Sequence, residues 1–69
     1  MTTIHFCEDG APDIIVSADT EVACVKALWD RIKCDDGPLS EEPADLNALA
    51  DAVYNAFGGE CWIEIDEEN

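Results

Sequence analysis

Basic residues are scarce in this chain of 69 residues, which has three Lys and Arg against 17 Asp and Glu and a formal net charge of −14. The three bases, Lys26, Arg31 and Lys33, are clustered, and Asp30 among them offsets part of their charge. Proteins that bind nucleic acid neutralise phosphates with many Lys and Arg side chains. The composition therefore argues against direct nucleic-acid binding and predicts that DNA repels the chain.

Long apolar runs and closely spaced cysteines are also missing. The chain has no run of about 18 apolar residues, so we expect no membrane span. It also has no basic segment followed by a shorter apolar run, so we expect no signal peptide and a cytoplasmic protein. Four cysteines contain no C-x-x-C pair: Cys7, Cys24, Cys34 and Cys61. In a reducing compartment we expect free thiols. A disulfide, or a zinc site that includes His5, is the lesser alternative.

Motifs for catalysis are absent. The only histidine is His5, and there is no nucleophile elbow, phosphate-binding loop or dinucleotide-binding glycine motif. Seventeen acids bring some carboxylates together by chance, but a chain this short has no room for a deep pocket that would shift their pKa values. The acids around Gly37 lack the alternating ligand spacing of a calcium loop, which leaves at most a loose cation site. We expect no enzyme activity and no cofactor or bound metal.

Apolar residues recur at helical spacing in the segment that carries the bases. The stripe consists of Val22, Val25, Leu28, Trp29 and Ile32. Asp19 or Thr20 is suited to cap the start, and the basic residues lie toward the end, where they complement the helix dipole. The pattern predicts a helix over about residues 20–34, with Trp29 in the core.

A second helix is predicted over about residues 41–57. Its start is indicated by Ser40 followed by Glu41, Glu42 and Pro43, and its end by two glycines. One face is apolar and consists of Leu46, Leu49, Ala50, Val53 and Phe57.

Three segments alternate as half-buried strands, over about residues 2–7, 13–17 and 60–66. The first two form a hairpin in which Ile4 and Phe6 face inward with Ile14 and Val16. In the third, apolar residues alternate with Trp62, Glu64 and Asp66.

These elements predict an α+β fold, a single domain over residues 1–69. With 48% hydrophobic residues the chain should fold despite its charge. The expected architecture is a two-layer ββααβ sandwich, with both helices packed on one face of a three-stranded sheet. After an up-down helix pair, we expect the third strand to run antiparallel to the second and parallel to the first, next to either one. The uncovered face should carry His5, Ile15, Trp62, Glu64 and Asp66.

The third strand also predicts a partner-binding surface. Glu64 and Asp66, continued by Glu60 or by Asp13 of the neighbouring strand, would form a rigid row of negative charge. Trp62 lies within that row and would add an apolar anchor. Further acidic pairs are Asp35 and Asp36, between the predicted helices, and Glu41 and Glu42, at the start of the second one. A surface of this kind is attracted to a protein with a basic groove, above all one that holds nucleic acid.

In overall character the chain resembles the small, acidic, phage-encoded anti-CRISPR inhibitors and other DNA-mimic proteins. The features that carry the resemblance are its size, the near absence of bases, and the acidic stretches at residues 8–9, 35–36, 41–42 and 64–68. The resemblance implies a stoichiometric inhibitor, monomeric or weakly dimeric, that covers the DNA-binding surface of a CRISPR effector complex in the host bacterial cytosol.

Two alternatives remain. The chain could be an immunity protein or antitoxin that blocks a toxin nuclease. It could also be a structural or oligomeric phage protein whose open sheet face, with Ile15 and Trp62, pairs with itself.

Overall fold

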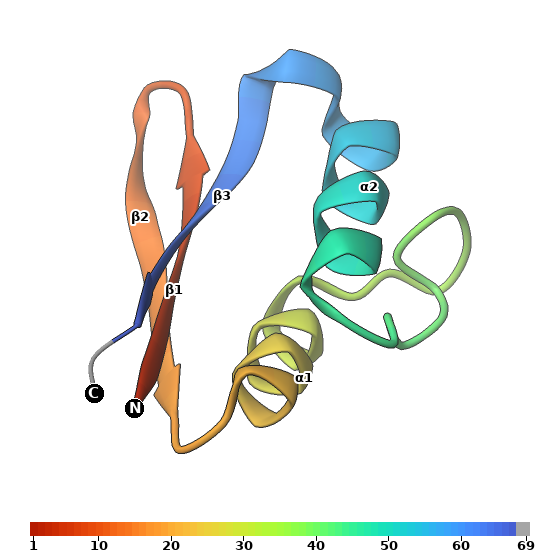
Figure 1. Ribbon diagram of the computed structural model, residues 1–69. Coiled ribbons are helices and arrows are strands. Elements are labelled where there is room, and N and C mark those ends of the chain that lie inside the picture. The colour runs from red at the N-terminus through yellow and green to blue at the C-terminus, as the bar shows by residue number, and fades with distance from the viewer. Residues whose placement is uncertain (68–69) are drawn as a thin grey trace.

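The computed structural model (Figure 1) describes residues 1–67, so the last two residues of the expected domain lie outside the described part. The elements in chain order are β1 (Thr2–Glu8), β2 (Ala11–Ala18), α1 (Glu21–Ile32), α2 (Leu46–Phe57), the 3₁₀ turn η1 (Gly58–Glu60) and β3 (Cys61–Glu67). The fold is α+β with the predicted ββααβ order.

The β1–β2 hairpin has the predicted register. Ile4 lies opposite Val16 and Phe6 opposite Ile14, so all four face the helices. Gly10 in the turn has a φ of 80°, a conformation that side chains with a Cβ rarely adopt. Alternation therefore predicts which hairpin residues face inward, but β2 begins at Ala11, two residues before its predicted start, and its pairing with β1 is irregular between Phe6 and Glu8.

The third strand lies beside β1, in the order β2-β1-β3, and runs antiparallel to it. The expectation that this strand would run parallel to the first was wrong. It assumed that the helices form an up-down pair, but α1 and α2 run in the same general direction along the sheet, joined by the loop of residues 33–45 (Figure 1). As a result β3 starts from the same end of the sheet as β2.

Helix α1 is capped as predicted, and Val25, Leu28, Trp29 and Ile32 of the predicted stripe pack in or against the core, but Val22 does not. The Thr20 hydroxyl accepts a hydrogen bond from the Ala23 amide at 3.1 Å. Cys24 and Leu28, one turn apart, are fully buried, whereas Val22 is 65% exposed, so its predicted place in the apolar stripe was wrong. The sheet contacts the side of the helix that carries Cys24, and Val22 lies away from that contact.

Trp29 is half-buried at the margin of the core rather than inside it. Its indole N–H donates to the backbone carbonyl of Leu39 at 2.9 Å. Leu39, in the connection between the helices, is completely buried. The indole thus attaches that connection to α1.

Helix α2 begins later than the predicted residue 41. Its first residue is Leu46, and the Asp45 carboxylate accepts from the Ala48 amide at 2.8 Å. Ser40, predicted to start the helix, instead donates from its hydroxyl to the Gly37 carbonyl at 2.8 Å. It closes a turn, so Glu41 and Glu42 belong to the connection and not to the helix.

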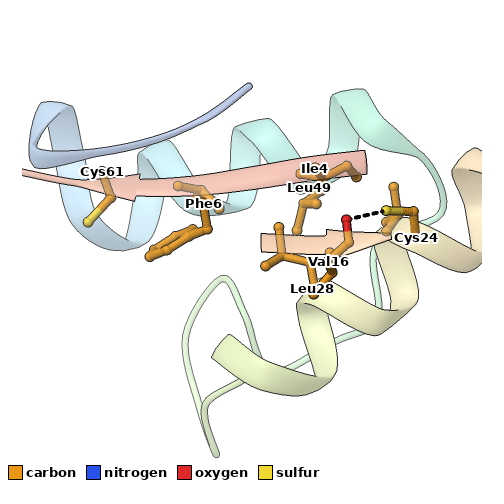
Figure 2. Packing of buried hydrophobic residues seen from close by; sticks show 9 residues of the cluster. Ile4, Phe6, Val16, Cys24, Leu28, Leu49 and Cys61 are labelled. Atoms are coloured by element: carbon orange, nitrogen blue, oxygen red, sulfur yellow. Dashed lines mark hydrogen bonds between the residues drawn. The ribbon is translucent and has the colours of Figure 1, made fainter. Parts of the chain in front are cut away.

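The core lies between the sheet and the two helices (Figure 2). The Cys24 thiol donates to the Val16 carbonyl at 3.4 Å and links α1 to β2. Phe57 at the end of α2 packs edge-to-face on Phe6, with ring centroids 5.8 Å apart. Because both helices pack on this side, no element in the described part of the chain covers the opposite side of the sheet.

Candidate functional site: the open sheet face

The side of the sheet that faces away from the helices, called here the open face, presents side chains from all three strands. They are Asp13, Ile15 and Ser17 from β2, Thr3, His5 and Cys7 from β1, and Trp62, Glu64 and Asp66 from β3. His5 lies at the centre, between Ile15 and Glu64. The five residues predicted for this face are all present on it.

Cys7 is the one buried side chain of the open face, at 3% exposure. Its thiol donates to Oε2 of Glu64 at 3.3 Å. Burial, the hydrogen bond to Glu64 and the nearby negative charge of Asp13 raise the pKa of Cys7 from 9.0 to about 11. The thiol therefore remains neutral near pH 7 and acts as a hydrogen-bond donor rather than as a nucleophile.

A shallow hollow of about 200 Å³ lies beside the central histidine, lined by His5, Glu64, Ile65 and Asp66. Nε2 of His5 is 4.0 Å from Oδ2 of Asp66. Small-molecule sites typically occupy about 300–1,000 Å³ and bury most of their ligand. This hollow suits a single side chain of a partner better than a substrate.

Two large apolar side chains interrupt the polar surface of the open face. Trp62 is 46% exposed and Ile15 is 54% exposed, on the two edge strands. The prediction that Trp62 is a surface residue is confirmed. Exposed aromatic residues of this kind are common anchors in protein interfaces.

The structure divides the acidic residues that the sequence grouped together. Glu64 and Asp66 are neighbours on β3, and Glu60 is exposed just before that strand. Asp13 lies on the other edge strand with β1 between, so it flanks the face but does not continue the row on β3.

The four acids between the helices are not part of the open face. Asp35, Asp36, Glu41 and Glu42 are exposed in the connection of residues 33–45, which lies at the helices and away from the sheet (Figure 1). The candidate site is therefore smaller than the sequence suggested, and centred on β3.

Sequence reasoning missed the part that Cys7 plays in the open face. Cys7 lies two residues after His5, so strand alternation alone predicts that both side chains lie on the open face. Its burial depends on the pairing of β1 with both neighbouring strands, which brings Trp62 opposite it. The described cysteines are all free thiols.

Residues 1–67 contain no group of three or more His, Cys, Asp or Glu side chains arranged to hold a metal ion. Within the same part of the chain, no helix has the length and apolarity needed to cross a membrane.

No family model matches the chain, and neither a curated protein nor a solved structure matches it.

Proposed function

We propose that this protein is a stoichiometric inhibitor that binds a basic, nucleic-acid-binding surface of a bacterial effector and blocks its access to DNA. One observation carries the proposal: Glu64 and Asp66 lie beside the exposed Trp62 on a sheet face that no helix within residues 1–67 covers. A CRISPR effector complex in the host bacterial cytosol is the partner that fits this chemistry.

The strand supplies the rigidity that such a contact needs. Side chains on one face of a strand repeat every 6–7 Å or so, so Glu64 and Asp66 present two carboxylates at a spacing set by the backbone. The hydrogen bond from Cys7 further orients Glu64. A prearranged pair of charges loses less entropy on binding than two flexible surface acids would.

The distribution of bases favours the same face. Lys26, Arg31 and Lys33 all lie on or next to α1, in the helical layer, and Nζ of Lys33 is 3.6 Å from Asp30. The nine side chains of the open face include no Lys or Arg. A basic partner is therefore attracted over long range by the net charge and meets no repelling cation on the sheet.

The first test removes charge without changing shape. Glu64→Gln with Asp66→Asn keeps an acceptor for the Cys7 thiol, and the matched control, Glu41→Gln with Glu42→Gln, removes the same charge from the connection between the helices. We expect the first pair to weaken inhibition of DNA binding by a purified CRISPR effector complex by about tenfold or more, and the control far less. Inhibition by the wild-type chain should also weaken steeply from low to high salt.

A second arm of the experiment tests the apolar anchor. Trp62→Ala should weaken inhibition, whereas Tyr54→Ala, which truncates a 66% exposed aromatic on α2, should not. Simultaneous binding of DNA and inhibitor to the effector would rule out occlusion. Equal losses in the two charge variants would rule out the open face as the site.

Self-association through the open face is the second candidate function, because Ile15 and Trp62 are both exposed there. Light scattering after size-exclusion chromatography separates the two: a dimer that Ile15→Ser dissociates would support a structural role.

A further inference from the structure

The two edges of the sheet differ in how well they are protected against pairing with another strand. The outer strand β2 contains Pro12, which has no N–H to donate, and its pairing with β1 is irregular between Phe6 and Glu8. Proline and irregular pairing are devices that discourage an added strand. The other outer strand, β3, has neither: its pairing with β1 runs unbroken from Cys61 to Glu67.

The outer edge of β3 also lacks a backbone partner. Over residues 61–66 the strand's only backbone partner among residues 1–67 is β1. The hydrogen bond that joins the Asp9 amide to the Glu60 carbonyl, at 3.0 Å, lies just before the strand. The remaining N–H and C=O groups of β3 are thus available to a further strand.

The two sides of β3 specify what an added strand would carry. On the open face it would meet Glu64 and Asp66. On the helix side it would meet Ile63, which is half-buried, and Ile65, which is 38% exposed although it faces the helical layer. An incoming strand is matched if it alternates basic residues on one side with apolar residues on the other.

A second copy of the chain is a poor occupant of this edge. Antiparallel pairing of two β3 strands about their centres would place Glu64 of one copy opposite Glu64 of the other, in chains that each carry −14. Like charges directly opposite one another destabilise a strand pair. Glu64 and Asp66 thus disfavour pairing of β3 with β3 of a second copy, and they attract a strand that carries basic residues.

We propose that β3 accepts a fourth strand from an extended segment of the partner protein, in which Lys or Arg alternates with apolar residues. This inference rests on the proposed function for the basic character of the partner and adds the mode of binding. Backbone hydrogen bonds would supply affinity, and the acids and isoleucines of β3 would select the sequence.

The test is an NMR titration of the isotope-labelled wild-type protein with a capped synthetic peptide. The peptide is acetyl-Lys-Val-Lys-Val-Lys-Val-amide. Two further peptides are methylated on backbone nitrogens only. One carries N-methyl groups on the backbone nitrogens of all three lysines, and the other on those of all three valines. Because alternate residues of a strand point their N–H groups to opposite edges, only one methylated peptide should lose binding, by about tenfold or more. Shifts should concentrate on residues 61–66.

Equal binding by both methylated peptides would overturn strand addition, since a purely ionic contact does not depend on peptide N–H groups. Absence of binding by the parent peptide would overturn it as well. Dimerisation of the chain through β3 would overturn the charge argument. The peptide titration and the effector competition assay are independent measurements. The proposed inhibition can therefore be correct if strand addition is wrong, and strand addition can be correct if the proposed inhibition is wrong.

A variant pair separates the edge from the acidic face. Ile65→Thr alters the helix side of β3 and should weaken peptide binding, while Val22→Thr, at the 65% exposed residue on α1, should leave it unchanged. Equal binding by both variants would contradict a role for the helix side of β3.

Discussion

Cys7 shows how a single side chain acquires its character from the strands around it. On an isolated strand it would be an ordinary exposed thiol. Here it is buried between Asp13 and Glu64, which approach from opposite edge strands, and its pKa rises to about 11. Burial also raises the pKa of Cys24 and of Cys61, so three of the four thiols are harder to ionise than a free cysteine.

These shifts predict a loss of stability at alkaline pH. Below about pH 9 the Cys7 thiol is neutral in both the folded and the unfolded chain, and its contribution to stability is complete. As the pH rises from 9 toward 11 the unfolded thiol ionises while the folded one does not, so the free energy of unfolding falls. Thermal melts across this range should show a smaller fall for Cys7→Ala than for the wild type.

The control for the alkaline melts is Cys34→Ala, which removes an exposed thiol. It shows what the loss of a cysteine outside the core does to the melts, and the effect of Cys7→Ala is compared with it. A Cys7→Ala slope identical to that of the wild type would show that Cys7 does not ionise differently in the folded state.

At the scale of elements, two segments before α2 both have the composition of a helix start, but only one of them caps the helix. Ser40 followed by acids and a proline has the composition of a helix start, yet Asp45 is the residue that caps the helix. Ser40 bonds to Gly37, whose φ of 88° makes a tight turn possible. Burial of Leu39 within that connection competes with extending the helix backwards.

The cap predicts a measurable difference between two acids of the same region. Asp45→Ala should destabilise the protein by about 1 kcal/mol, because the Ala48 amide loses its acceptor. Asp51→Ala removes the same charge from an exposed position inside α2 and should cost much less. Urea melts of the two variants make the comparison, and equal losses would contradict the cap.

At the scale of the whole molecule, charge opposes folding. The chain carries −14 on 69 residues, and its bases are confined to α1 and the residue that follows it. Most of the acidic surface therefore has no neutralising neighbour, and repulsion among the carboxylates favours the unfolded chain.

We accordingly expect the melting temperature to rise as NaCl increases from low to moderate concentration, since the Debye length shortens to about 10 Å at 0.1 M. The Glu41→Gln, Glu42→Gln variant, with less charge to screen, should respond less. A melting temperature that falls with added NaCl would show that repulsion does not dominate.

The sequence by itself determined the fold class, the number of strands and α-helices, the inward-facing residues of the hairpin and the side of the sheet on which each strand residue lies. These features depend on local periods and turn residues. Alternation alone placed Trp62, Glu64 and Asp66 on the open face, because neighbouring strand side chains point to opposite sides whatever the strand order.

Only the tertiary structure decided which strands are neighbours, that Cys24 rather than Val22 completes the buried face of α1, and which acids share a surface. Pairing β3 with β1 brought Glu64 to Cys7 and left β3 as an open edge. The path of residues 33–45 placed Glu41 and Glu42 away from the sheet. These outcomes depend on contacts between segments that are distant in sequence. The fold adopted is the one in which these contacts together have the lowest free energy, and this cannot be calculated from the local sequence pattern of any one segment.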